Sequence, residues 1–216
     1  MGLRWVGVVT LIATLGFDEK FTVRALMRHA GRFKKLYVVT AHPLEERAEK
    51  ALSTVREFAL RYIGGVELRT VTVDPQKPAE AVAEIKKKIF LQDLASEYII
   101  NISGGMRALV FELVLAAVLS RIKGIFEIEL ENFKGLVMVP VEYFMIQPLC
   151  TEEYKIVKVL VSMGQATAEE LRAHTGIPRS TLYRYLKELV NRGVVNVEKV
   201  NKKSVYKPSS TAYILL

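Results

Sequence analysis

Residues that form covalent cross-links and metal centres are scarce in this sequence. Cys150 is the single cysteine, so no disulfide can form within the chain, and a reducing location in the cytoplasm fits this count. The three histidines, His29, His42 and His174, are too scattered along the chain to suggest a cluster of metal ligands. The sequence therefore predicts neither a metal nor a cofactor.

Long apolar runs, targeting signals and common catalytic motifs are absent as well. The longest apolar run, residues 108–119, is interrupted by Glu112 and is shorter than the roughly 20 residues that span a membrane, so we expect no membrane association. No N-terminal signal pattern, P-loop or spaced-glycine dinucleotide motif occurs. Neither a Ser-His-Asp set nor a His-Glu-x-x-His motif is recognisable, so we expect no catalytic residues and a chain that is not an enzyme.

Positive charge is in excess and is densest toward the C-terminus. The formal net charge is +8, and from Leu149 onward 11 Lys and Arg residues stand against six Glu, which gives +5. Such an excess indicates a polyanionic partner, with a basic solvated surface as the alternative.

The most informative segment is residues 98–107, which predicts a strand, a tight turn and the start of a helix. The turn is Ser103 followed by Gly104–Gly105, and paired glycines let a ligand approach the main chain closely. The free N–H groups of the helix N-terminus and the charge of Arg107 both favour an anion. We predict that this turn binds a phosphate-bearing ligand. The alternative is that Ser103 caps the helix and the glycines only end the strand.

Strands alternate with helices through residues 1–140. This order predicts an α/β fold with a Rossmann-like, mostly parallel sheet and helices on both faces. We expect strands at 6–14, 36–40, 66–73, 98–102, 126–131 and 136–140, and helices at 19–29, 44–62, 79–91 and 106–122. Asp18 is the expected N-cap of the first helix.

In such sheets, ligands bind at the carboxyl ends of strands where the strand order reverses. Three predicted turns follow strands, and the first and last of them are neighbours if the first and fourth strands pair. The candidate ligand-binding residues in these turns are Leu15, Gly16, Phe17, Asp18, Thr40, His42, Ser103, Gly104, Gly105, Met106 and Arg107.

The helix at 106–122 is apolar on nearly all of its sides, whereas a helix that covers one face of a sheet keeps a polar outer stripe. A twofold partner would cover the second apolar side, so we expect a homodimer in which two copies of the Ser103–Gly105 turn face each other. The alternative is a helix buried beneath its own neighbours.

A second domain is predicted at 151–216, joined to the first by a linker at 141–150 that contains Pro148. Helices are expected at 151–163, 168–175 and 179–191, followed by strands at 194–200 and 204–207. Three helices followed by a basic hairpin form a winged helix-turn-helix, a DNA-reading domain.

The third of these helices and the hairpin turn carry the side chains that suit contact with phosphates and base edges. The candidate DNA-binding residues are Arg179, Ser180, Thr181, Tyr183, Arg184, Lys187, Lys202 and Lys203. The alternative is a winged helix that serves protein contact or dimerisation.

Three features together resemble a known family: Leu-Gly-Phe-Asp-Glu-Lys-Phe at 15–21, Ser-Gly-Gly-Met-Arg at 103–107, and the C-terminal winged helix. The chain resembles, over essentially its whole length, the archaeal CRISPR-associated regulators of the Csa family, which join a CARF (CRISPR-associated Rossmann fold) domain to a winged helix. The resemblance implies a homodimer that binds the effector cyclic tetra-adenylate across its twofold axis and binds double-stranded DNA at CRISPR–Cas promoters. Both motifs would line the ligand site.

Some relatives with this ligand domain are similar to ring nucleases, and this leaves an enzymatic alternative. A hydroxyl and a basic residue promote attack by the ribose 2′-OH in such enzymes, and Ser103 and Arg107 would supply them here. Arg24 and His29 also match the Arg-x4-His spacing of HEPN ribonucleases, but that pattern belongs to an all-helical domain.

Overall fold

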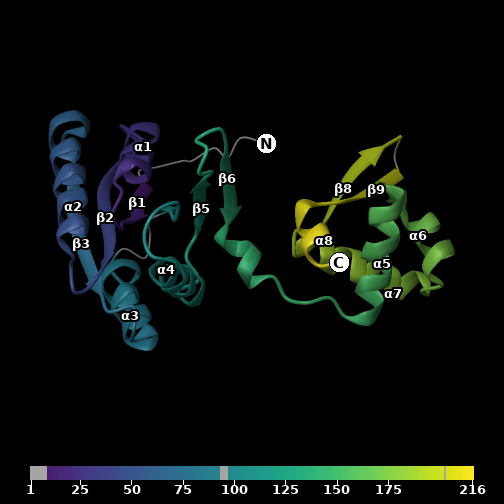
Figure 1. The fold of residues 1–216 in the computed structure, drawn as a ribbon. Helices are drawn as coiled ribbons and strands as arrows, with labels where there is room; N and C mark the ends of the chain where they lie inside the picture. Colours follow the sequence, from purple (N-terminus) through teal and green to yellow (C-terminus); the bar gives the residue numbers. More distant parts are fainter. Residues whose placement is uncertain (1–8, 93–96, 202) are drawn as a thin grey trace. The chain divides into compact units, whose positions relative to one another are not determined.

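The computed structural model describes residues 9–92, 97–201 and 203–216, in two units, Met1–Met145 and Ile146–Leu216 (Figure 1). Two sequence predictions lie partly outside the described residues: the beginning of the first strand at 6–8, and Lys202. Within the described residues, no helix has the length and apolar character that crossing a membrane requires.

The first unit is built on a six-stranded sheet in the order β3-β2-β1-β4-β5-β6. Its strands are β1 (Val9–Thr14), β2 (Phe33–Ala41), β3 (Glu67–Val73), β4 (Glu97–Asn101), β5 (Gly124–Glu129) and β6 (Leu136–Pro140). All neighbouring pairs are parallel except β5 and β6, which form an antiparallel hairpin. The predicted Rossmann-like, mostly parallel sheet is confirmed.

Four helices cover this sheet: α1 (Lys20–Arg28), α2 (Glu46–Phe58), α3 (Pro78–Ile85) and α4 (Arg107–Leu119). The helices α2 and α3 continue as π-helical turns at Ala59–Ile63 and Lys86–Phe90. Neighbouring residues of β1 point to opposite faces: Leu11 packs into a core with α1 and α2, and Ile12 into a core with α3 and α4. Helices therefore lie on both faces of the sheet, as predicted.

The strand order reverses between β1 and β4. From β1 the chain continues through β2 to β3 on one side, and it then crosses to β4 on the other side of β1. The strands β1 and β4 pair in parallel with Ala13 opposite Asn101, so their carboxyl ends lie at the same edge. The first and fourth strands therefore pair, which is the condition under which the sequence placed the first and last turns side by side.

The first unit ends later than the predicted linker allows. Val141–Met145 forms a 3₁₀ helix whose first residue, Val141, is buried in the core with α3 and α4. The apolar side chain of Val141 keeps this segment on the sheet because its exposure would cost burial free energy. Only 146–150 remain between this helix and the first helix of the second unit.

The second unit is a winged helix-turn-helix around its own apolar core. Its elements are α5 (Thr151–Met163), β7 (Ala166–Thr167), α6 (Ala168–Thr175), α7 (Arg179–Asn191), β8 (Val195–Val200), β9 (Lys203–Pro208) and α8 (Ser210–Ile214). The three long helices match their predicted bounds. The short strand β7, which pairs with β9, and the terminal helix α8 were not predicted.

Candidate functional site

A glycine turn lies at the switch point between β1 and β4. The hydroxyl of Thr14, the last residue of β1, donates a 2.6 Å hydrogen bond to the carbonyl oxygen of Gly104. Gly105 has φ +87°, and a Cβ there would lie 3.0 Å from Cβ of Thr14. A Cβ on Gly16 would likewise lie 3.1 Å from Cα of Gly105. The two loops therefore pack so closely at these positions that a side chain on either glycine would force its neighbour to move.

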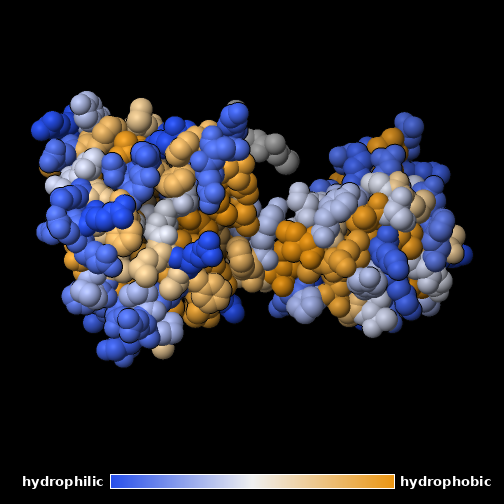
Figure 2. Space-filling model, in the orientation of Figure 1, coloured by the Kyte–Doolittle hydropathy of each residue, from blue (hydrophilic) through white to orange (hydrophobic). Residues whose placement is uncertain are grey.

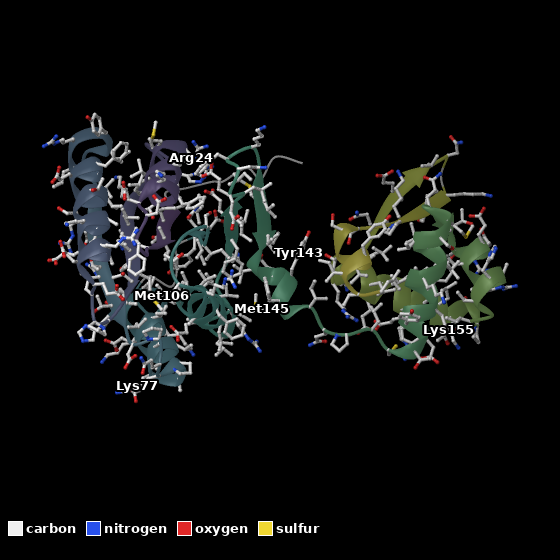
Figure 3. The ribbon with its side chains drawn as sticks, in the orientation of Figure 1. Arg24, Lys77, Met106, Tyr143, Met145 and Lys155 are labelled. Carbon is white, nitrogen blue, oxygen red and sulfur yellow. The ribbon has the colours of Figure 1, made fainter. Side chains whose placement is uncertain are left out.

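The glycine turn presents main chain and one arginine to solvent. The helix α4 begins at Arg107 after an extended Met106, whose side chain makes no capping hydrogen bond. Met106 is 48% exposed, and Gly105 and Arg107 are exposed as well. Within the described part of the chain Arg107 forms no ion pair. An anion at this turn would meet first-turn N–H groups and a free guanidinium. Figure 3 labels Met106, the residue just before α4.

Ser103 does not cap α4, contrary to the alternative interpretation of its role. Its Oγ accepts a 2.8 Å hydrogen bond from the main-chain N–H of Glu129, the last residue of β5. Its own N–H donates to Oδ1 of Asn101 at 3.4 Å. Ser103 thus ties the glycine turn to β5, and the helix N-terminus is left without a side-chain cap.

The loop after β1 combines buried and exposed candidates. Leu15 is buried, and its N–H donates to the carbonyl oxygen of Val39 in β2. Phe17 is 47% exposed. Asp18 is not the N-cap of α1, as was predicted, because the chain becomes helical one residue later and Glu19 occupies that position. The carboxylate of Asp18 instead accepts from the N–H of Lys20 at 2.9 Å.

The two predicted ligand-binding residues at the end of β2, Thr40 and His42, also differ in exposure. Thr40 is only 1% exposed, whereas His42 is exposed beyond the end of the strand. The side chains of Thr40 and Leu15 pack in the interior, and a ligand at the surface would not reach them. Of the predicted ligand set, the structure therefore brings the exposed parts of two loops together: Gly16–Asp18 and Gly104–Arg107.

An ion-pair network between α1 and β5 was not recognised in the sequence. Arg24 Nε lies 2.6 Å from Glu129 Oε1, and Arg28 Nη2 lies 2.9 Å from Glu129 Oε2. Arg28 also pairs with Glu127, and His29 Nε2 lies 2.6 Å from Glu127 Oε2. The side chains of both glutamates are almost completely buried. Arg24, labelled in Figure 3, extends from α1 toward the β5–β6 hairpin.

The charges of this network hold both carboxylates ionised. Burial raises the pKa of Glu127, but hydrogen bonds and charges from His29, Arg28 and Asn101 outweigh burial and leave the pKa below its ordinary value. The pKa of Glu129 is also lowered, because Arg24 and Arg28 outweigh its burial. Arg24 and His29, the pair with HEPN-like spacing, thus contact the buried glutamates of β5.

This network reaches the glycine turn through Asn101, the last residue of β4. The Asn101 side chain donates to Glu127 Oε1 at 3.1 Å and accepts from the N–H of Ser103. The turn between β5 and β6 also contacts α1, because the Phe133 ring lies 5.3 Å from the ring of Phe21. The turn is therefore supported from β1 by a hydroxyl and from β5 by a buried polar network.

The helix α4 leads away from the glycine turn and exposes an apolar stripe. Phe111, Leu115 and Leu119 are 69%, 38% and 56% exposed, whereas Leu109 and Leu113 on its other side are fully buried. Figure 2 shows hydrophobic surface over α4 and along the β5–β6 side of the first unit. The alternative that α4 is buried beneath its own neighbours is wrong for this stripe.

The second unit presents the predicted basic face on α7. Leu182, Leu186 and Leu189 are buried, which turns the other side of the helix outward. Of the predicted DNA-binding residues on α7, Thr181 is half-buried and the others are exposed: Arg179, Ser180, Tyr183, Arg184 and Lys187. Arg179 lies over the ring of Tyr183 at 5.8 Å, and Arg184 over that of Tyr185 at 5.0 Å.

The hairpin of β8 and β9 forms the wing. Its turn contains Asn201 with φ +49°, and Lys203 is exposed at the start of β9. Arg192, just beyond α7, pairs with the buried Glu153 of α5 at 2.8 Å and donates to the carbonyl oxygen of Gln147 at 2.6 Å. This arginine holds the beginning of α5 to the end of α7, so the charge available to DNA lies on α7 and the wing.

Comparison with known proteins assigns a family to each unit. Residues 9–140 match the family model described as the Csa3 CRISPR-associated Rossmann-like domain. Residues 149–212 match the model described as the sugar-specific transcriptional regulator TrmB. A search of curated proteins returned no match.

Solved structures with a similar fold are distant in sequence. Can2 from Sulfobacillus thermosulfidooxidans, in complex with cyclic tetra-adenylate, has TM-score 0.45 and 10% identity over 95% of this chain and 63% of Can2. VC1899 from Vibrio cholerae has TM-score 0.44 and 11% identity over 96% of this chain and 64% of that one. BpsR from Bordetella bronchiseptica, whose DNA binding is regulated by 6-hydroxynicotinic acid, has TM-score 0.30 and 16% identity over 31% of this chain and 49% of BpsR. The chain spans less than two thirds of each, and its assignment depends on the family models alone.

Proposed function

Because the chain belongs to the family of Csa3 CRISPR-associated Rossmann-like domains, we propose that it is a transcription regulator controlled by a cyclic oligoadenylate. The TrmB-type winged helix that follows this domain supports the proposal. The first unit binds the effector and the second binds double-stranded DNA at CRISPR–Cas promoters, in the cytoplasm. The observation that carries the proposal is the exposed glycine turn at the β1/β4 switch point, with Arg107, which has no ion pair among the described residues, at the start of α4.

The chemistry of this turn suits a ring that carries several phosphates. At this turn each chain offers the N-terminus of α4 and the guanidinium of Arg107, both of which favour a phosphate. A ring with twofold symmetry would meet the same groups from two chains. The family resemblance points to cyclic tetra-adenylate, and its four phosphates divide equally between two chains.

A homodimer would form this symmetric site, and the exposed stripe of α4 supports it. Phe111, Leu115 and Leu119 expose apolar area that a twofold copy of α4 would cover. Because α4 starts at Arg107, two helices packed across an axis would bring two glycine turns near each other. The dimer would also present two copies of α7, as a DNA site with two halves requires.

We propose that the ring is bound without rapid cleavage, so that the chain is a regulator and not an enzyme. Ser103, the hydroxyl that a ring nuclease would use, accepts a hydrogen bond from the N–H of Glu129 and serves to hold the turn. Arg24 and His29 are occupied by the buried glutamates of β5. For the alternative, a ring nuclease, Ser103 and Arg107 are the candidate catalytic residues, and Arg107 forms no ion pair among the described residues.

A paired experiment separates the two functions. The purified chain is incubated with cyclic tetra-adenylate, the nucleotide is analysed by chromatography, and the protein is tested for a gel shift with DNA from a CRISPR–Cas promoter. We expect an intact ring and a DNA affinity that changes when the ring is added. Rapid conversion of the ring to linear fragments would favour the nuclease, and a ring without effect on DNA binding would contradict the regulator.

A further inference from the structure

Phe17 and Arg47 form a contact between two loops at the carboxyl edge of the sheet. Phe17 follows β1, and Arg47 lies in the first turn of α2, after β2. The Arg47 guanidinium carbon lies 5.1 Å from the centre of the Phe17 ring, and the ring is 47% exposed. One arginine thus lies over an aromatic ring that still has open surface.

Apart from its contact with the Phe17 ring, the charge of Arg47 has no acidic partner within the described part of the chain. Arg47 is exposed and forms no ion pair there, whereas its neighbour Glu46 pairs with Lys50. A cation in the first turn of a helix also lies at the positive end of the helix dipole, which disfavours it. Neither helix stability nor an acidic partner explains an arginine at this position.

The pair adjoins the glycine turn directly. Gly16 packs against Gly105 so closely that a Cβ on Gly16 would lie 3.1 Å from Cα of Gly105, and Phe17 is the next residue. The helices that carry Arg47 and Arg107 follow β2 and β4, the two strands that flank β1 on opposite sides. Neither arginine forms an ion pair among the described residues, so both remain available to a ligand at this edge of the sheet.

We propose that Phe17 and Arg47 form a nucleotide subsite beside the glycine turn. In this subsite the phenyl ring of Phe17 stacks on a purine base of the ligand, and the Arg47 guanidinium binds the phosphate attached to that nucleotide. This inference rests on the proposed function and extends it from phosphate binding to recognition of the base. Aromatic rings bind bases through their π-faces, and a purine offers the larger face. Arginine binds phosphate with a fixed fork of N–H donors.

The test measures binding of cyclic tetra-adenylate to the full chain by titration calorimetry at several salt concentrations. Phe17→Leu keeps an apolar side chain but removes the π-face, and we expect affinity to fall about tenfold with an unchanged salt slope. Arg47→Gln is expected to weaken binding and to make the affinity less dependent on salt, because one charged phosphate contact is lost. Phe17→Tyr and Arg47→Lys should restore most of the respective loss.

Matched controls come from the far end of α2. Tyr62 is 70% exposed, and Arg61 is exposed and pairs only weakly with Glu57 at 3.9 Å, so Tyr62→Leu and Arg61→Gln remove the same chemistry away from the site. In a further readout, a Trp in Phe17→Trp should change its fluorescence when the ring binds, and one in Tyr62→Trp should not. Thermal unfolding verifies that all variants fold, as the exposure of these side chains predicts.

The outcomes separate the subsite from the function. If the wild type binds the ring and Phe17→Leu and Arg47→Gln bind it equally well, the subsite is wrong and the proposed function stands. If the wild type binds no oligoadenylate ring, the proposed function fails and the subsite fails with it. A tenfold loss in both variants with wild-type affinity in both controls supports the subsite.

Discussion

The hydroxyl of Thr14 donates a 2.6 Å hydrogen bond to the carbonyl oxygen of Gly104 and so joins the end of β1 to the turn after β4. The bond crosses the point where the strand order reverses. It fixes one side of a turn whose other side is tied to β5 by Ser103. The shape of the proposed effector site therefore depends on two hydroxyl groups that lie behind it.

Replacing this hydroxyl by a methyl group tests its role. We expect Thr14→Val to lower the free energy of unfolding by about 1 kcal/mol and to weaken ring binding, because the Gly104 carbonyl loses its partner. Thr14→Ser should restore both. Thr54→Val, which removes a similar bond to the Lys50 carbonyl within α2, should leave ring binding unchanged. Calorimetry and thermal unfolding measure the two effects; undiminished ring affinity in Thr14→Val would refute the role of this bond.

The buried glutamates of β5 predict a loss of stability in acid. Because the pKa values of Glu127 and Glu129 are lowered in the folded chain, the unfolded chain binds more protons in acid. Their stabilisation is complete above the ordinary carboxyl pKa of about 4.3 and is lost as the pH falls through the folded values. We expect the melting temperature to fall steeply below about pH 4.5.

Glu127→Gln isolates this effect. It breaks a buried ion-pair network, so we expect a loss of about 3 kcal/mol at pH 7 and a weaker dependence on pH in acid. Glu46→Gln, which removes an exposed pair with Lys50, should retain the pH dependence of the wild type. Circular dichroism melts between pH 7 and pH 3.5 provide the measurement. A wild-type pH profile in Glu127→Gln would show that the network does not control acid stability.

The basic face of α7 predicts that DNA and ring binding are separable. Arg184 is exposed on this helix, and Arg184→Ala should weaken binding to promoter DNA about tenfold while the affinity for the ring stays the same. Lys158→Ala, which removes an exposed charge from α5, serves as the control. Gel shifts at several salt concentrations and calorimetry with the ring measure both affinities. Equal loss of both would contradict separate sites.

The apolar stripe of α4 predicts a dimer that one charge disrupts. Phe111 is 69% exposed, so Phe111→Glu should leave the fold intact and convert a dimer into a monomer by burying a charge in the interface. Leu60→Glu places the same charge on a residue that is 78% exposed beyond α2 and should remain dimeric. Light scattering after size-exclusion chromatography gives the mass. A monomeric wild-type chain would exclude the proposed interface.

The main elements and their pairing were predictable because they depend on local patterns. Apolar runs such as 98–102 mark buried strands, and Gly176 and Gly193, just beyond the ends of α6 and α7, stand where glycine commonly ends a helix. The pairing of β1 with β4 entered the sequence analysis only as a condition, and the general rule for open parallel sheets then placed a ligand site at the ends of these strands. That rule names the loops of a site but does not say which loop side chains point outward. Thr40 and Leu15 were therefore included although both are buried.

The α1–β5 network was not predicted because it depends on contacts between residues about a hundred positions apart. A signal was present: Arg24 and Arg28 recur at the spacing of one helix face, and Glu127 and Glu129 at that of one strand face. Which helix covers which strand is decided by the fold, and only the fold pairs these charges. The same holds for Phe17 and Arg47, whose contact depends on the adjacency of β1 and β2.

The most direct measurement is a calorimetric titration of the full chain with cyclic tetra-adenylate, compared between wild type, Gly105→Ala and Gly64→Ala. Both glycines have positive φ, +87° and +61°, but only at Gly105 would a Cβ meet Thr14, whereas nothing lies within 4 Å of one at Gly64. We predict one ring bound per two wild-type chains, retained in Gly64→Ala and lost in Gly105→Ala. No binding of any oligoadenylate ring, or one ring per single chain, would contradict a symmetric effector site at the glycine turn.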